Sequence, residues 1–267
     1  APGPTDVWPL VAAADARGCA FAWSDGAPIS VADFLRDVQH VAAELPPISR
    51  ALNACNDRYL FAVALGACLA RDIVTLVPPA RTQGVLAQLR GDAADLVLLV
   101  DPDDREPDGG LPMHRIELGA RTAATPSLPA LPGTQLVARV YTSGSTGQPQ
   151  AQPKYWGPLV RGAAAQLQRL AAVAPPNIAL VGTVPPQHAY GFESTVMIAL
   201  AGGAALTASK PFFPADIAAA LEALPRPRGL VTTPFHLRTV LDAGIPLPPL
   251  DLLLSATAPL SSALAGA

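Results

Sequence analysis

The sequence predicts an α/β protein in which parallel sheets are flanked by helices in two wound subdomains. Three observations lead to this prediction. Short apolar runs alternate with helical patterns along most of the chain. Several runs, such as DLVLLVD at 95–101, are apolar on both faces, as strands of a covered parallel sheet are. An acidic stretch at 101–112 and a Pro-rich one at 124–133 interrupt the alternation. We therefore place one subdomain at 1–133 and a second at 134–267.

Before the interruption, the pattern predicts two helices and two strands. The segment 58–70 is almost entirely apolar and is expected to form a buried helix. A β-branched run at 72–79 ends at two prolines and is expected to be a strand. A helix over 81–90 and the strand at 95–101 follow.

After the interruption, strands and helices alternate regularly, which predicts right-handed βαβ units and a parallel sheet. Proline near the start of a helix and glycine after its end support several of the boundaries. The predicted strands are 134–143, 177–185, 204–209, 229–234 and 250–257, and the predicted helices are 157–174, 191–203, 214–224 and 235–244. Residues 259–267 begin a further helix.

Composition excludes several classes of protein. The 267 residues are 50% hydrophobic and 15% charged, with a formal charge of −3, so we expect neither disorder nor nucleic-acid binding. The three cysteines form no CxxC pair, so no disulfide framework or zinc site is indicated. No apolar run reaches the roughly 20 residues of a membrane helix, and no signal peptide is evident. We expect a cytoplasmic protein without membrane insertion.

The segment YTSGSTGQPQ at 141–150 is the best candidate for a functional loop. It follows a predicted strand, where ligand loops of open parallel sheets lie. Gly144 and Gly147 let backbone N–H groups converge on an anion, and the neighbouring hydroxyls add neutral donors. The segment lacks the Walker, dinucleotide and nucleophile-elbow patterns. On the residues alone, a phosphate-binding loop and an ordinary Ser/Gly turn both remain open.

The amino-acid sequence of this loop closely resembles the phosphate-binding signature T-S-G-[ST]-T-G-x-P-K of the adenylate-forming superfamily. This superfamily includes acyl- and aryl-CoA synthetases, peptide-synthetase adenylation domains and luciferases. Three further stretches are similar to segments of the family in the same order, PPQHAYGFESTVMIALAGGAAL at 185–206, TTPFHLRTVL at 232–241 and LLLSATAPLSSAL at 252–264. The resemblance covers most of the chain and implies the N-terminal portion of such an enzyme.

The resemblance implies a ligase that uses ATP and Mg²⁺ to convert a small carboxylic acid into an acyl- or aryl-adenylate. The acyl group then passes to a thiol of CoA or of an acyl carrier protein. The resemblance implies catalytic roles for His188 and Lys154, and acid-binding roles for His188, Tyr190, Gly191 and Thr233. The residues implied to bind the nucleotide are Thr142, Ser143, Gly144, Ser145, Thr146 and Gly147, together with Ser255, Ala256 and Thr257.

The sequence departs from the family pattern in two respects. Gln150 stands where the signature has lysine, and we consider both that Lys154 supplies the missing charge and that it is simply solvated. The family's Mg²⁺, ribose and C-terminal domain residues would come after residue 267, so we expect this chain alone to be inactive. Ala256 and Thr257 replace glycines of the family.

Two alternative functions remain open. The first is a non-catalytic nucleotide- or acyl-binding module of the same fold. The second is a serine hydrolase that uses Ser143 or Ser145 with His188, although the nucleophile elbow is missing. His40 and His114 show no partner pattern and are expected at the surface.

Overall fold

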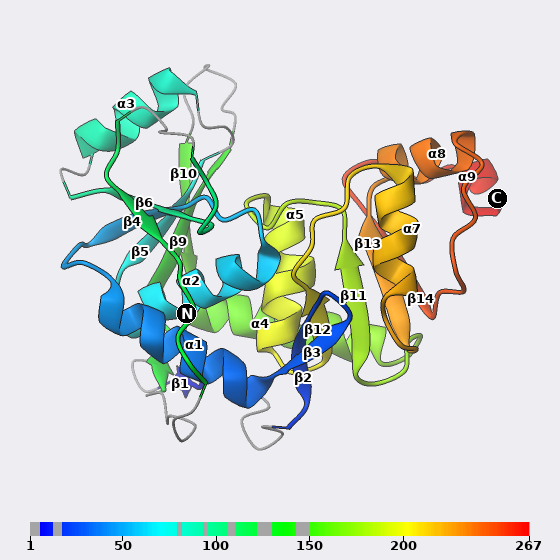
Figure 1. The fold of residues 1–267 in the computed structure, drawn as a ribbon, viewed down its shortest axis with the longest axis horizontal. Helices are drawn as coiled ribbons and strands as arrows, with labels where there is room; N and C mark the ends of the chain where they lie inside the picture. Colours follow the sequence, from blue (N-terminus) through cyan, green and yellow to red (C-terminus); the bar gives the residue numbers. More distant parts are fainter. Residues whose placement is uncertain are drawn as a thin grey trace. The chain divides into compact units, whose positions relative to one another are not determined.

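The computed structural model describes residues 6–12, 18–78, 82–92, 95–105, 110–121, 130–142 and 150–266 (Figure 1). The chain divides into two compact units, which we describe separately. The first comprises residues 1–10, 32–56 and 60–161, and the second comprises 11–31, 57–59 and 162–267. The longest segment of the first unit ends at residue 161, and that of the second unit begins at residue 162. From the sequence, a boundary was predicted after residue 133. The strands that follow residue 133 explain this difference, because they complete the first sheet.

The first unit is built on a six-stranded sheet in the order β10-β9-β5-β4-β6-β7. All neighbouring strands are parallel except β9 and β10, which form an antiparallel pair. The strands are β4 (Arg50–Asn53), β5 (Val74–Val77), β6 (Val97–Val100), β7 (Met113–Arg115), β9 (Leu136–Thr142) and β10 (Gln150–Tyr155). Strands β1 (Val7–Trp8) and β8 (Leu131–Pro132) form a separate antiparallel ribbon.

Apolar residues of the helices cover this sheet. The helices concerned are α1 (Val31–Glu44), α2 (Arg58–Ala70), α3 (Gln83–Asp92) and the start of α4 (Trp156–Leu170). Leu86 and Leu89 of α3 join strand residues such as Leu52 and Leu98 in one buried cluster. In α2, a Cβ on Gly66 would lie 2.8 Å from a methyl carbon of Val38, so the close approach of α2 and α1 requires glycine there.

The second unit contains a six-stranded sheet in the order β14-β13-β11-β12-β2-β3. Its strands are parallel except for the edge hairpin of β2 and β3, which turns at Asp25 and Gly26 with positive φ at both residues. The strands are β2 (Ala20–Ser24), β3 (Ala27–Ser30), β11 (Ile178–Gly182), β12 (Ala204–Thr207), β13 (Arg228–Thr232) and β14 (Leu252–Ser255).

Both faces of this second sheet are covered, which explains the apolar strands. Ala179 and Val181 of β11 pack in a cluster with residues of α7 (Pro214–Glu222) and α8 (Pro234–Asp242). Ile178 and Leu180 of the same strand pack with residues of α4 and α6 (Ile198–Leu200). Helices α7 and α8 begin with proline at the first turn, and α8 is capped by the hydroxyl of Thr233.

The predicted fold class is confirmed. The buried helix at 58–70 and the alternating strands and helices after residue 176 lie within a few residues of their predicted bounds. Where a helix was predicted over 191–203, the chain is helical from Ala189 to Leu200, as α5 (Ala189–Gly191), a π-helical turn η2 (Phe192–Met197) and α6. A terminal helix α9 (Ser262–Gly266) follows β14. In the described part of the chain, no helix is both long and apolar enough to cross a membrane.

Candidate site at the carboxyl ends of the strands

The structure describes the two residues at which the predicted loop begins and ends. Ser143, Gly144, Ser145, Thr146 and Gly147 lie outside the described residues. Strand β9 ends at Thr142 and β10 begins at Gln150, and these two residues are partners in the antiparallel ladder. The loop therefore starts and ends at one place, at the carboxyl end of β9, where ligand loops of parallel sheets lie.

Strand pairing also locates Lys154. This residue lies on β10 opposite Ala138, and its side chain is partly buried. It lies four positions along the strand from Gln150, which corresponds to roughly 13 Å. The register thus carries Lys154 away from the base of the loop.

The second unit gathers the remaining predicted residues at one edge of its sheet. Strands β11, β13 and β14 are adjacent and parallel, so their carboxyl ends lie together. His188 follows β11, Thr233 follows β13, and Ser255 ends β14. A hydrogen bond joins the ends of β14 and β13 directly, since the backbone N–H of Ala256 donates to the carbonyl of Thr232 at 3.4 Å. The edge therefore brings together residues that are far apart in the sequence, from His188 to Ala256.

His188 and Tyr190 have different surroundings. His188 precedes α5 and is exposed, and its side chain does not cap the helix by a hydrogen bond. Tyr190 is half-buried, and its hydroxyl donates to the carbonyl of Leu254 in β14 at 3.0 Å. Burial raises the pKa of Tyr190 to about 12, although a backbone hydrogen bond at Thr232 opposes this shift. Tyr190 thus anchors α5 to β14, and its hydroxyl is already engaged.

Gly191 has a packing reason to be glycine. A Cβ at this position would lie 2.1 Å from the carbonyl oxygen of Pro185, a distance that real Cβ contacts do not reach. The hydroxyl of Thr195 also donates to the Gly191 carbonyl at 2.5 Å, within the π-helical turn. Such turns are frequent at functional sites. The absence of a side chain at Gly191 therefore allows the segment after β11 to approach the start of this turn closely.

The turn after β14 shows two signs of an incomplete site. The hydroxyl of Ser255 is buried and has no hydrogen-bond partner among the described residues. Thr257 has a φ of 80°, a left-handed conformation that favours glycine and is strained for a β-branched residue. Both residues were predicted to bind the nucleotide. An unpaired buried hydroxyl is uncommon in folded proteins, so this turn is a candidate binding site.

Sequence reasoning missed the residue that fixes the segment after β11. Arg58 is fully buried, and its guanidinium donates to the carbonyls of Gly182 and Val184 at 2.8 and 2.9 Å. It also donates to Thr207 and Ser209 after β12, at 3.2 and 2.8 Å. Burial lowers the pKa of Arg58 to about 10, against the opposing charge of Asp57. Arginine at the start of an apolar helix gave no signal of this role.

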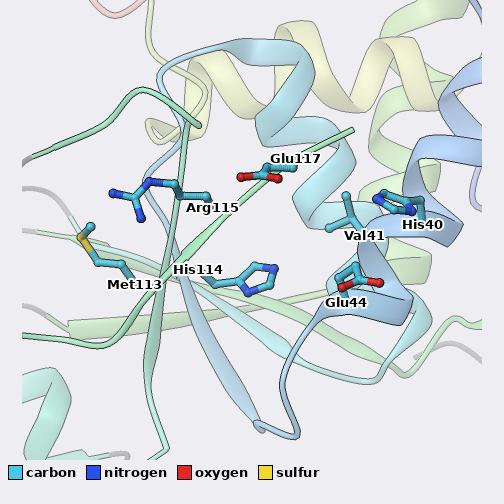
Figure 2. Close-up of a pocket in the computed structure, with 7 residues that line it drawn as sticks. All are labelled: His40, Val41, Glu44, Met113, His114, Arg115 and Glu117. Carbon is cyan, nitrogen blue, oxygen red and sulfur yellow. The ribbon is translucent and has the colours of Figure 1, made fainter. Parts of the chain in front are cut away.

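A separate pocket of about 550 Å³ lies in the first unit and contains none of the predicted site residues (Figure 2). Figure 2 shows His114 of β7 pointing toward Glu44 of α1, while Arg115 points to the other side of the strand. Burial lowers the pKa of His114, and the charges of Glu44 and Glu117 oppose this shift. Its imidazole is only partly exposed, unlike the surface residue predicted from the sequence.

The pocket also shows why one nearby glycine is needed. A Cβ on Gly119 would lie 2.7 Å from the ring of His40, so this ring packs directly on the backbone. Despite its two histidines and two glutamates, the pocket does not form a metal site. Across the residues that the structure describes, no group of three or more His, Cys, Asp or Glu side chains could hold a metal ion.

Comparison with known proteins identifies the family. A family model described as AMP-binding enzyme matches residues 41–267. The chain belongs to the AMP-binding enzyme family. The resemblance of the loop and of the later segments is thereby confirmed at the level of the family. No curated protein sequence matches the chain.

Solved structures share the fold of this AMP-binding chain. A malonyl-CoA ligase with methylmalonyl-CoA and AMP bound is 21% identical, with a TM-score of 0.68 over 88% of this chain and 50% of that one. The o-succinylbenzoate CoA synthetase MenE from Bacillus subtilis, in complex with AMP, is 15% identical, with a TM-score of 0.74 over 97% and 56%. ATP-bound MatB from Rhodopseudomonas palustris is 19% identical, with a TM-score of 0.69 over 96% and 55%. The chain thus spans about half the length of these structures.

Proposed function

We propose that this chain provides the nucleotide- and acid-binding part of an ATP-dependent ligase that activates a carboxylic acid. The observation that supports this most is the set of polar groups at the carboxyl ends of β11, β13 and β14, including the orphaned hydroxyl of Ser255. Membership of the AMP-binding enzyme family agrees with it. The chain's free cysteines suit a reducing cytoplasm.

The proposed reaction has two steps. A carboxylate oxygen of the acid attacks the α-phosphorus of ATP, the bond from that phosphorus to the bridging oxygen breaks, and pyrophosphate leaves. A thiol of CoA or of a carrier protein then attacks the acyl carbon and displaces AMP, while the thiol proton passes to solvent. Both steps need the reacting groups held in line and the developing charge stabilised by fixed donors.

Named residues of this chain would supply those functions. The loop donors from Thr142 to Gly147 would bind the phosphates, and Ser255, Ala256 and Thr257 would contact the AMP portion. His188, exposed after β11, would approach the carboxylate, with Thr233 on the adjacent strand. Tyr190 and Gly191 would shape the site, because one is bonded to β14 and the other is tightly packed. The described residues do not fit a Mg²⁺ site, so we derive no step through the metal.

The Ser255 hydroxyl gives a direct test. A buried hydroxyl without a partner costs roughly 1–3 kcal/mol, so Ser255→Ala should stabilise the ligand-free chain by about 1 kcal/mol. If the hydroxyl serves a bound nucleotide, the same substitution should weaken AMP binding by about fivefold or more, measured by calorimetry. Ser262→Ala, at an exposed residue in the first turn of α9, is the matched control and should leave both quantities nearly unchanged.

Two outcomes would contradict this proposal. The first is a wild-type chain that binds neither ATP nor AMP at millimolar concentration. The second is a Ser255→Ala variant that gains stability but binds AMP as well as the wild type does. We also expect negligible exchange of labelled pyrophosphate into ATP by the 267 residues alone, and exchange at a rate typical of a ligase would contradict that expectation.

A non-catalytic module that binds a nucleotide or acyl group is the second candidate. Gln150 in place of the family's lysine, and Thr257 at a position that favours glycine, are the observations in its favour. Restoring Gln150→Lys should increase ATP affinity under either proposal. Lys154→Ala tests a separate point: unchanged ATP affinity would reject the idea that Lys154 replaces the charge missing at Gln150.

A further inference from the structure

Two buried threonines and a histidine form a hydrogen-bonded network at the carboxyl edge of the second sheet. Thr183 follows β11, Thr232 ends β13, and His236 lies in the first turn of α8. The hydroxyl of Thr183 lies 2.9 Å from that of Thr232 and 2.8 Å from Nδ1 of His236. The side chains of Thr183 and Thr232 are 2% and 0% exposed, so water does not satisfy them.

The network fixes which nitrogen of His236 carries hydrogen. Each threonine hydroxyl has one hydrogen to donate, and the described residues offer these hydroxyls no other acceptors. If Nδ1 carried a hydrogen, at least one buried hydroxyl hydrogen would lack an acceptor. If Nδ1 is bare, Thr232 donates to Thr183, and Thr183 donates to Nδ1. Because buried polar groups are almost always paired, the second arrangement is favoured.

The hydrogen of the neutral ring must then lie on Nε2. Among the described residues, this nitrogen has no hydrogen-bond partner, and the imidazole is partly exposed. Burial lowers the pKa of His236, which agrees with a ring that stays neutral at physiological pH. Its charged form would need a hydrogen on Nδ1 and would disrupt the network. His236 therefore presents a fixed N–H donor away from the buried hydroxyls.

Two aromatic rings contact the imidazole that carries this donor. The rings of Phe212 and Phe235 contact His236 edge-on, with centroid distances of 5.4 and 5.5 Å. Phe213 lies against Phe212 at 5.4 Å. These three phenylalanines are 56–67% exposed, although phenylalanine is usually buried. A single donor beside exposed aromatic rings suits a ligand that combines an acceptor oxygen with a flat apolar body.

We propose that His236 is a ligand-binding residue whose Nε2–H donates to an oxygen of an aromatic carboxylate, while Phe212 and Phe235 contact the ligand's ring. This inference rests on the proposed function, because it names the class of acid for the same edge of the sheet. The sequence alone favours a structural role for His236, as a residue in the first turn of a helix. Its bonds to Thr183 and Thr233 fulfil that role through Nδ1 and the backbone only.

The protonation state can be measured directly by ¹⁵N NMR of the histidine rings in the 267-residue chain. We expect the His236 signals of a bare Nδ1 and a protonated Nε2 at neutral pH, assigned by their absence in a His236→Asn variant. Thr183→Val should abolish this preference. Thr239→Val is the control, because its hydroxyl donates to the Phe235 carbonyl on the same helix and does not touch the ring. A protonated Nδ1 in the wild type would overturn the inference.

Two substitutions of His236 separate ligand binding through Nε2 from the buried hydrogen bonds through Nδ1. Asparagine can place an acceptor oxygen near the position of Nδ1 but cannot reach that of Nε2, whereas glutamine places its amide nitrogen near Nε2. His236→Asn should therefore keep its melting temperature but bind benzoate about tenfold more weakly. His236→Gln should lose stability yet bind benzoate within about threefold of the wild type. Equal benzoate binding by His236→Asn and the wild type would overturn the proposal.

The ligand class has its own control. Acetate carries the same acceptor without a ring and should bind at least about tenfold more weakly than benzoate. Equal affinities, or no shift of the Nε2 signal with benzoate, would contradict the aromatic assignment. ATP and AMP binding by the same samples is measured by calorimetry. If nucleotides bind and benzoate does not, only this inference fails, whereas a chain that binds benzoate but no nucleotide contradicts the proposed function.

Discussion

Thr257 is the residue with the clearest local strain. Its φ of 80° places a β-branched side chain in a region where glycine is favoured. Thr257→Gly should relieve this strain and raise the free energy of unfolding by about 1 kcal/mol, after allowance for the greater flexibility of glycine in the unfolded chain. Thermal or urea unfolding measures the change.

Asn177 provides the matched comparison. It also has a positive φ, of 57°, but asparagine tolerates this conformation. Asn177→Gly should therefore change stability by less than about 0.5 kcal/mol. A destabilised Thr257→Gly variant would mean that the Thr257 side chain makes a compensating contribution that outweighs the strain.

At the level of single residues, the sequence could predict where polar groups gather but not how they bond. Ser255 and Thr233 were named as site residues because of the family resemblance, and their binding roles remain predictions. The bond between Thr183 and His236 joins positions 53 residues apart. It exists because β11 and β13 are neighbours in the sheet, and strand order is not written in local patterns. Arg58 was unpredictable for the same reason. Its acceptors are buried carbonyls at the ends of β11 and β12, which lie more than 100 residues away in the sequence.

His114 of β7 and Glu44 of α1 should make the stability of this region depend on pH. Burial lowers the pKa of His114 below its ordinary value near 6.5, while Glu44 and Glu117 raise it. As pH falls through 6.5, the unfolded chain binds a proton at His114 before the folded chain does, so stability falls. His114→Gln should remove this contribution, and the stability of the wild type relative to the variant should decrease between about pH 7 and 5.

Glu44→Gln provides the second arm of this test. Without the Glu44 carboxylate, the folded-state pKa of His114 should drop further, so the loss of stability should extend to lower pH. Urea unfolding at a series of pH values measures both variants. A wild-type advantage that grows on acidification would show that the glutamates, and not burial, dominate the environment of His114.

Prediction of elements succeeded where strands are buried on both faces. Strand β11 and its neighbours were recognisable from continuous apolar residues, and helix α8 from Pro234 and Gly244 at its ends. Strand β10 gave no such signal, because its residues are mostly polar and include Pro153. It lies at the edge of its sheet, where polar residues and proline are tolerated. The three-residue edge strand β7 was too short to show a pattern.

For the whole molecule, burial rather than surface charge should dominate stability. The chain is 50% hydrophobic and only 15% charged, and the ion pair of Arg121 with Asp37 involves a carboxylate that is 1% exposed. Salt screens exposed pairs more than buried ones. Raising NaCl from about 0.05 to 0.5 M should therefore shift the melting temperature by less than about 2 °C.

Sodium sulfate is the informative comparison at equal ionic strength. Sulfate strengthens apolar burial as well as screening charge, so it should raise the melting temperature clearly more than NaCl does. Equal effects of the two salts, or a large fall with NaCl, would indicate that surface ion pairs contribute more than the composition suggests. The sequence placed a domain boundary after residue 133, and that division remains a prediction beside the two compact units of the structure.

The pairing of Thr142 with Gln150 determines how the chain would tolerate insertions and deletions. The seven residues 143–149 connect two points that the ladder already holds together, so adding residues there should cost little closure entropy. One residue inserted within β10 would instead reverse which face each later side chain of that strand occupies. Insertions between residues 143 and 149 should consequently leave the fold intact, whereas a one-residue insertion within β10 should destabilise it.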